Sequence, residues 1–307
     1  MTTKKDKALK QIGLLFLLVM GIFSANAQIK YGFKTGLNFA HINGPSETND
    51  AGAELETWKN STGFHIGMTF AYKFTDNFGL RGEFLYSKRG AKYTFEGQSY
   101  RIFQHSTGSV LTLGTSRYLI NVNNSYLDIP ILAFARFGDF EISGGGYAGI
   151  LVQTAGEGSL RYSGKTAGLG NDVYEQPNAT DTELNFNLNH NYRRDDPRTG
   201  ATEGETPVSV QVDGFVSETP KTLGAYYDLP DDKGSLYNTF DFGLVGGVSY
   251  YISNALYFNA RLQYGLSDIT NNKADLAKTR VGTNGELLFR DDKDKNFVIQ
   301  ASVGFSF

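Results

Sequence analysis

Hydrophobic and polar residues alternate along several stretches of this 307-residue chain. The last eleven residues give the clearest example, with apolar side chains at every second position: Phe297, Ile299, Ala301, Val303, Phe305 and Phe307. The residues between them are mostly small or polar, and the same period of two runs through 29–39 and 64–74. Such alternation predicts β-strands that have one apolar and one polar face.

The pattern predicts eight strands, at 29–40, 62–74, 78–90, 124–137, 140–153, 238–252, 255–269 and 296–307. Each is long enough to cross a bilayer at a tilt, which takes about 9–11 residues. Strands of a soluble sandwich are shorter, at about 5–6 residues. The lengths therefore favour a membrane-spanning barrel.

Short and long connections alternate between these strands. The short ones, at 75–77, 138–139 and 253–254, consist of residues typical of tight turns. The long ones lie at 41–61, 91–123, 154–237 and 270–295. This arrangement predicts an all-β fold, an eight-stranded antiparallel up-and-down transmembrane β-barrel with short periplasmic turns and long extracellular loops. An even number of strands places both termini at the periplasmic rim.

Two residue classes refine this barrel. Aromatic residues flank every short turn and predict a girdle at one membrane interface: Tyr72, Phe74, Phe78, Phe137, Phe140, Tyr250, Tyr251 and Tyr257. Pro130 is the single proline inside a predicted strand. Because proline has no N–H to donate to the ladder, we expect a bulge or a local opening there.

If the apolar positions face lipid, the other face lines the lumen. Charged residues at those positions form a predicted polar network of four bases and four acids: Lys34, Arg81, Glu83, Asp128, Arg136, Glu141, Asp241 and Arg261. An eight-stranded barrel is only wide enough to be filled by its own side chains. We therefore expect a plugged polar lumen, with a narrow ion or proton path as the alternative.

The N-terminus has the features of a secretory signal peptide. Four lysines precede the uncharged apolar run 12–23, and small residues stand at positions −3 and −1 before Gln28. The run is shorter than the about 20 residues of a spanning helix. The sequence predicts a signal peptide at 1–27, cleavage between Ala27 and Gln28, and a barrel domain at 28–307 that is exported to the cell outer membrane.

Composition excludes several other classes. The chain has 29 basic and 32 acidic residues and a formal net charge of −3, without the basic excess of a nucleic-acid binder. It has no cysteine, which excludes disulfides and thiolate metal sites. The segment from 157 to 233 holds 14 acidic and 7 basic residues. We interpret 154–237 as one long extracellular loop, in which the alternating residues 208–212 could extend a hairpin above the membrane.

Candidate chemical motifs lack the context that they need. The glycines of 144–149 match a dinucleotide fingerprint, but apolar strand residues follow where a helix should begin. The acidic run 291–296 lacks the glycine and closing glutamate of a calcium loop, so we interpret its charges as solvated. His41, His105 and His190 fall in or beside long loops and could join a surface triad, although no spacing requires one. We expect no cofactor, no bound metal and no catalytic residues.

Several strands resemble those of the PorT-like family of outer-membrane β-barrel proteins. The similarity is carried by Tyr126-Leu127-Asp128-Ile129-Pro130, which resembles that family's Y-L-[DE]-I-P strand, and by segments 31–38, 241–247, 264–269 and 303–307. The terminal Phe305 and Phe307 also resemble the aromatic signal that the barrel-assembly machinery reads during insertion. The resemblance implies a barrel in outer-membrane lipid, a secretion or assembly role in some members, and no catalytic residues. It covers the strands and not the long loops.

Three functions follow as hypotheses. The first is a non-enzymatic outer-membrane barrel whose loops recognise an extracellular or periplasmic protein partner or serve assembly or secretion. The second is a small, porin-like transport channel. The third is a surface hydrolase or acyltransferase that uses one of the loop histidines.

Overall fold

The computed structural model describes residues 29–49, 51–163, 183–212 and 215–307. The predicted signal peptide 1–27 and its cleavage site lie outside these residues. Every regular element in the described residues is a strand. Among them, no helix is long and apolar enough to span a membrane.

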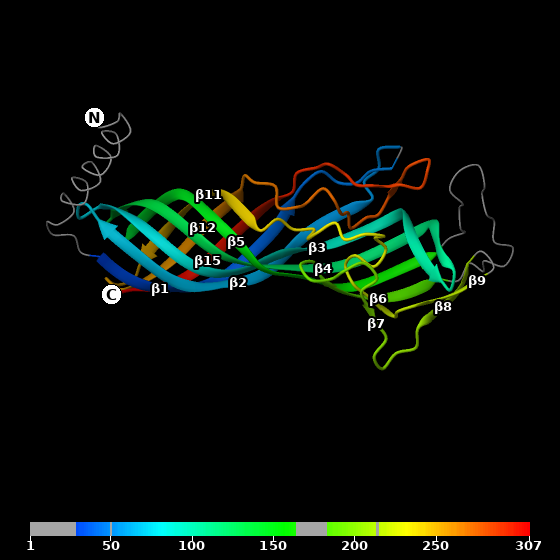
Figure 1. Cartoon of the computed structure of the whole chain (residues 1–307). Coiled ribbons are helices and arrows are strands. Elements are labelled where there is room, and N and C mark those ends of the chain that lie inside the picture. The colour runs from blue at the N-terminus through cyan, green and yellow to red at the C-terminus, as the bar shows by residue number, and fades with distance from the viewer. Residues whose placement is uncertain (1–28, 50, 164–182, 213–214) are drawn as a thin grey trace, which may run out of the picture.

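Eight strands form the barrel, and shorter ones lie beyond it (Figure 1). The barrel strands are β1 (Ile29–Asn43), β2 (Glu56–Lys73), β3 (Phe78–His105), β4 (Gly108–Phe137), β5 (Phe140–Ser163), β11 (Phe240–Tyr251), β12 (Leu256–Gly265) and β15 (Lys295–Ser306). The shorter strands are β6 (Leu184–Asn191), β7 (Gly200–Ala201), β8 (Val208–Val212), β9 (Phe215–Thr219), β10 (Thr222–Leu223), β13 (Arg280–Val281) and β14 (Leu287–Leu288).

The barrel is closed by antiparallel pairing between neighbouring strands. β1 pairs with β2 on one side and with β15 on the other, so the two ends of the chain meet in one ladder. The ring is completed by the pairing of β5 with β11 and of β12 with β15. The predicted eight-stranded up-and-down fold is confirmed. The start of β1 and the C-terminus lie at the end that carries the short turns (Figure 1).

Large apolar side chains cover the outside of the barrel. Phe33, Phe84 and Phe305 are examples from three strands, and all are exposed. Near the short turns the exposed aromatic residues are Phe74, Phe78, Phe137, Phe140 and Tyr250.

The girdle prediction was wrong for Tyr251 and Tyr257, which are only 5% and 2% exposed. Successive strand residues point to opposite faces, so Tyr250 faces lipid and Tyr251 faces the lumen.

Three strands continue far beyond the barrel. β3, β4 and β5 have 28, 30 and 24 residues. The interpretation of 91–123 and of the start of 154–237 as loops was wrong, because β3 and β4 stay paired as far as His105 and Gly108. Near residue 90 of β3, the outward face changes from apolar to polar and the inward face from polar to apolar. The lipid-facing pattern therefore ends there, whereas the strand continues.

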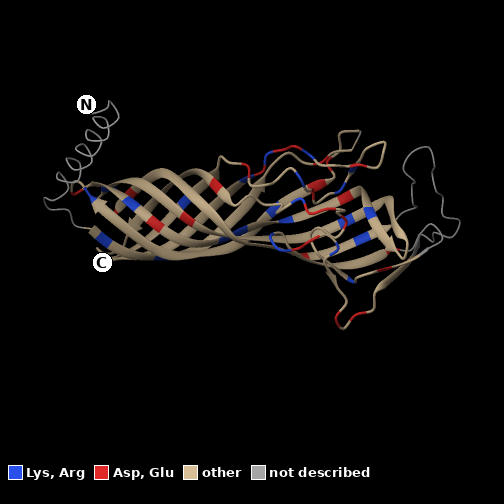
Figure 2. Cartoon of the chain, in the orientation of Figure 1, with Lys and Arg blue, Asp and Glu red and all other residues tan. Residues whose placement is uncertain are grey.

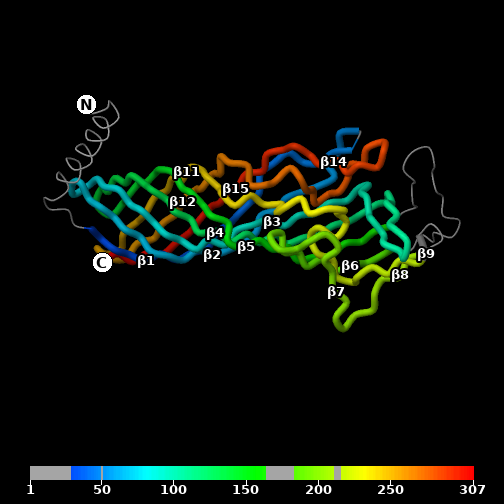
Figure 3. Tube along the Cα trace, in the orientation of Figure 1, coloured from blue at the N-terminus to red at the C-terminus, as the bar shows by residue number. Residues whose placement is uncertain are grey.

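We call this part the extension: residues 91–122 of β3 and β4, 154–163 of β5, and strands β6, β10 and β7, which add to the same sheet in that order. The predicted hairpin strand at 208–212 is confirmed as β8, which pairs with β9. The connections 44–55 and 266–294 run beside each other along the extension (Figure 3). Glu47 in the first binds Arg280 and Arg290 in the second.

The ladder is irregular at three places. The pairing of β3 with β4 is interrupted between Gly82 and Leu85, opposite Ile129 and Pro130, while its register is unchanged. This is the local opening expected at the proline. Two register shifts lie elsewhere. One is between Ser125 and Tyr126, where β4 pairs with β5, and the other is between Asn60 and His65, where β2 pairs with β3.

Candidate functional site: barrel interior and extension

Acidic and basic residues lie along the barrel strands (Figure 2), and the buried ones meet in ion pairs inside the barrel. Nearest the short turns, Arg81 and Glu141 form a bidentate pair, with N–O distances of 2.6 and 2.9 Å. Tyr251 donates its hydroxyl proton to Glu141 across 3.0 Å. The Arg81 guanidinium also lies 4.9 Å from the centre of the Phe134 ring.

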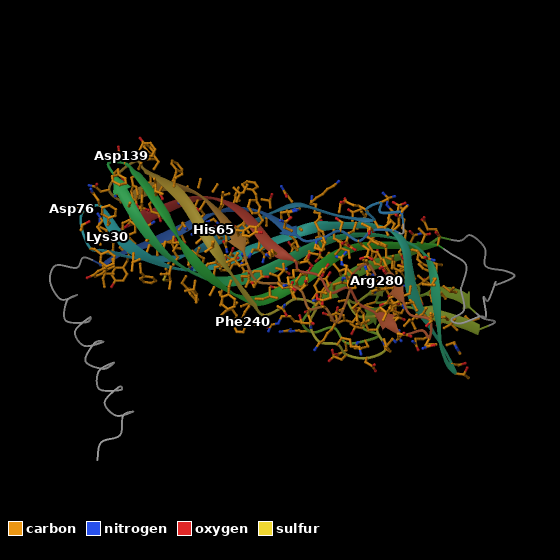
Figure 4. All side chains as sticks on the ribbon, turned by 90° about the horizontal axis from the view of Figure 1, so that it is seen from above. Lys30, His65, Asp76, Asp139, Phe240 and Arg280 are labelled. Atoms are coloured by element: carbon orange, nitrogen blue, oxygen red, sulfur yellow. The ribbon has the colours of Figure 1, made fainter. Side chains whose placement is uncertain are left out.

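Glu83 occupies the middle of the barrel between two cations. Its Oε2 atom accepts from Lys34 Nζ at 2.8 Å and from Arg261 Nη1 at 2.6 Å. His65 lies in the same part of the barrel (Figure 4) and bonds to Asn38 and Ser302, at 2.8 Å on each ring nitrogen. All of these side chains are buried.

The third group lies where the barrel meets the extension. Arg89 Nη2 is 2.7 Å from Asp128 Oδ1, and Arg89 Nη1 is 3.5 Å from Asp241 Oδ2. Tyr147 and Asn296 also donate to Asp241, at 3.0 and 2.9 Å. A Cβ atom added to Gly149 would come within 2.8 Å of Asp128 Oδ1. This glycine leaves room for the ion pair, and the strand around it holds no helix for a dinucleotide.

The structure places seven of the eight predicted lumen residues in this buried network, together with one that the sequence analysis missed. Arg136 lies at the short-turn rim, half-buried, with its guanidinium 3.6 Å from the centre of the Tyr251 ring. Arg89 takes a place inside. It continues the inward series of Arg81, Glu83, Leu85 and Ser87, and this period of two could have identified it.

The extension has a core of a different kind. Its inward side chains are aromatic and aliphatic, and they pack against residues from the connections that cover the sheet. The cluster includes Tyr93, Phe95, Tyr118, Ile120, Leu160, Phe186, Leu188, Tyr192, Tyr226, Tyr227, Leu229, Leu236 and Tyr237. Residues 154–237 are therefore not one solvated loop, since many of the described ones belong to a packed structure.

Buried charges attach two connections to the extension. Asp228 Oδ2 is 2.9 Å from Arg101 Nη1 of β3 and 2.8 Å from Lys278 Nζ. Burial alone would raise the pKa of Asp228, but the two cations hold it below its ordinary value. Asp228 therefore stays charged. It links β3 to the segment before β11, in which Asp228 lies, and to the segment after β12, which holds Lys278.

A second charged cluster lies at the base of the extension. Arg290 binds Glu47 Oε2 at 2.9 Å and Glu56 Oε1 at 3.0 Å, and it also pairs with Asp292. The interpretation of 291–296 as solvated charges was wrong for Asp294, which is 6% exposed. Thr270 donates to Asp294 Oδ2 at 3.1 Å.

The three loop histidines stand on three different strands. His41 is on β1, His105 ends β3, and His190 on β6 is buried against the Tyr192 hydroxyl at 3.0 Å. Burial, with Lys278 nearby, lowers the pKa of His190 to about 3. In the residues that the structure describes, no group of three or more His, Asp or Glu side chains could hold a metal ion. Phe305 and Phe307 are exposed at the short-turn end.

A closed barrel of eight strands with an apolar outer surface defines an integral outer-membrane protein. The family described as outer membrane protein beta-barrel domain matches residues 24–271, and the chain belongs to it. The protein therefore resides in the outer membrane. No curated protein matches the chain.

Solved structures with a similar fold include three outer-membrane or surface proteins. Ail, the attachment invasion locus protein of Yersinia pestis, shares 11% identity at a TM-score of 0.32, covering 91% of this chain and 98% of that one. Neisserial surface protein A shares 10% identity at a TM-score of 0.29, with coverages of 92% and 99%. OprG of Pseudomonas aeruginosa shares 11% identity at a TM-score of 0.27, with coverages of 91% and 95%.

Proposed function

We propose that the protein is a non-enzymatic recognition protein of the cell surface, in which the barrel is the membrane anchor and the extension binds a protein partner. The observation that carries the proposal is the continuation of β3, β4 and β5 as one ordered sheet beyond the barrel. Ordering each residue costs about 1–2 kcal/mol of backbone conformational entropy. A connection that only joins two strands would not need a packed core and buried ion pairs to hold it.

The barrel interior supports an anchor rather than a pore. Arg81, Glu83 and Arg89 from β3 each meet an opposite charge from a strand that is not a neighbour of β3. Eight strands leave an interior that side chains fill. The strands resemble those of PorT-like proteins, some of which act in secretion or assembly. The proposed protein partner could therefore be a component of such a system.

The test removes the extension as a unit. Residues 92–121 are replaced by Asn-Gly, which joins the paired residues Ala91 and Val122, and residues 157–233 are replaced by a short Gly-Ser linker. We expect this variant to insert and to remain heat-modifiable in electrophoresis, but not to complement a host strain that lacks the protein. Full complementation by a correctly inserted variant would overturn the proposal.

A narrow channel is the second candidate, and one observation favours it. Buried polar atoms of Arg89, Arg261 and Gln263 inside the barrel have no hydrogen-bond partner among the described residues, which suits ordered water. Planar-bilayer recording separates the two functions. The anchor predicts a conductance no higher than that of a lipid blank, whereas reproducible unit steps would favour the channel.

A further inference from the structure

We propose that a cluster of basic residues at the outer edge of the membrane binds an outer-leaflet lipid that has a phosphorylated sugar head group. The cluster consists of Lys59 on β2 and of Lys88 and Lys92 on β3, and all three side chains point outward where the barrel meets the extension. Figure 2 shows basic residues on the strands at this level. The inference goes beyond the recognition function, because it concerns the lipid around the protein and not a protein partner.

The lysines lie where the apolar outer surface of the barrel ends. On β3, the exposed Phe84 faces lipid, and Lys88 lies four residues further towards the extension on the same face. On β2, Phe64 is the last large exposed apolar residue before Lys59. Cations at the boundary between lipid and water are positioned to meet the charged head groups of lipids. The cluster is therefore at the level of the outer head groups.

A bulge in β2 turns Lys59 to this outward face. Between Asn60 and His65, β2 has one residue more than the facing part of β3. His65 is buried in the barrel, and without the bulge Lys59 would point to the same side as His65. Bulges re-aim side chains in this way. As a result Lys59 lies directly opposite Lys92, and both side chains are exposed.

No counter-charge from the chain accompanies these lysines. Among the described residues, no ion pair includes Lys59, Lys88 or Lys92. Like charges that lie directly opposite each other destabilise a sheet. Three ammonium groups on one face also create a positive potential that attracts a multiply charged anion.

A second pair of opposed basic residues is neutralised by the chain itself. Arg117 of β4 lies opposite Arg161 of β5 in the extension, and both are exposed. The Arg117 Nε atom is 3.6 Å from Glu96, and the Arg161 Nη1 atom is 3.7 Å from Glu183. The lysine cluster differs in having no such acid and in lying at the edge of the lipid. We infer that the membrane supplies its negative charge.

The surroundings of the lysines favour a lipid with a sugar phosphate. Gly90 stands between Lys88 and Lys92, so no side chain separates the two ammonium groups along the strand. Asn121 and Asn123 of β4 lie opposite Lys92 and Gly90, and their amides can bind the hydroxyl groups of a sugar. Exposed apolar side chains lie directly below, towards the short turns, so one amphiphile can occupy both surfaces. A soluble polyanion would contact the lysines alone.

The test measures lipid binding to the full chain in nonionic detergent by native mass spectrometry. The probes are diphosphoryl lipid A, its dephosphorylated form, phosphatidylglycerol and, as a soluble polyanion, a heparin fragment. We expect lipid A to bind in a one-to-one complex, and both the dephosphorylated form and phosphatidylglycerol to bind about tenfold more weakly or not at all. Equal binding of phosphatidylglycerol would overturn the assignment of a sugar phosphate.

Matched double variants locate the site. Lys59→Gln with Lys92→Gln should weaken lipid A binding about tenfold or more and leave heat-modifiability unchanged. Arg117→Gln with Arg161→Gln removes the same charge from the outward face of the extension and should bind lipid A normally. Equal binding by the two double variants, equal binding of the dephosphorylated lipid, or binding of the heparin fragment alone would overturn the proposal. None of these outcomes bears on the protein partner, which the complementation experiment tests separately.

Discussion

The barrel and the extension share the same strands but have opposite interiors. Along β3, the inward side chains are mostly polar up to Arg89 and become Ala91, Tyr93 and Phe95 beyond it. The outward side chains change in the other sense, from Leu80 and Phe84 to polar residues. The side-chain orientation along the strand is continuous through this change, since every second residue still points inward.

The surroundings of each part determine which face of the sheet is apolar. In lipid, apolar residues face outward and charged residues must pair inside. In water, burial of apolar surface stabilises the fold, so the same sheet turns its aromatic residues inward. The level of Gly90 therefore marks the outer edge of the membrane.

The largest expected effect comes from breaking one lumen cluster. Glu83→Gln leaves Lys34 and Arg261 buried without their carboxylate, and removal of one partner from a buried ion pair costs about 3–5 kcal/mol. The free energy of unfolding in urea, followed by heat-modifiability, measures the loss.

Glu96→Gln on the same strand is the matched control. Glu96 pairs with Arg117 at 3.6 Å, but both side chains are more than half exposed. An exposed pair contributes about 0–1 kcal/mol. Similar losses in both variants would contradict the contrast between the two interiors.

A smaller effect is expected from a charge on the outer face. Phe84→Lys places an ammonium against lipid near the middle of 78–90, the membrane-spanning part of β3, where it costs about 2–4 kcal/mol. Thr94→Lys changes an outward position of the extension beside Lys92 and Glu96, and we expect a change within about 0.5 kcal/mol. Unfolding of both variants in lipid vesicles checks this. Equal costs would place residue 94 inside the membrane.

The smallest effect is a pH dependence of the connection 266–294. Burial, with Asp292 nearby, raises the pKa of Asp294 to about 7. The folded state then holds this proton more tightly than the unfolded chain. Stability from this group is present at low pH and is lost as the pH rises towards about 7, by about 1.4 kcal/mol for each unit of pKa difference.

Hydrogen exchange of residues 266–294, corrected for intrinsic rates, measures this loss. We expect protection to be on the order of a hundredfold higher at pH 5 than at pH 8, and Asp294→Asn to abolish the difference. The groups that face Asp294 are Asp292, Asp268 and Arg290, with Thr270 as hydrogen-bond donor. A pH dependence that persists in the variant would assign it to one of those groups.

The barrel could be predicted from the sequence because two-residue alternation in lipid is strict. The strands around Phe33, Phe70 and Phe305 follow it without a break, and the alternating turn lengths supply the topology. The extension could not be predicted in this way, because its outward face is polar and its inward face changes from charged to aromatic. When the apolar and polar faces exchange within one strand, the sequence pattern wrongly predicts that the strand ends there.

The lumen network was accessible to sequence reasoning, whereas the contacts of the connections were not. Arg81 and Glu141 stand on inward positions of predicted strands, so their burial follows from the period. The pairing of Asp228 with both Arg101 and Lys278 brings together residues up to 177 positions apart through segments without periodicity. The pairing of Arg290 with Glu47 and Glu56 likewise depends on how the connection 266–294 folds back on β2, which no local pattern encodes.

The length of β3 has a consequence for the shape of the protein at the cell surface. From Gly90 to the tip at His105 the strand has about 15 further residues, which at about 3.3 Å each correspond to about 50 Å of chain. The hydrocarbon layer beneath is only about 30 Å thick. More of this molecule lies outside the lipid than within it. Anything that approaches the cell therefore contacts the far end of the extension before it contacts the bilayer.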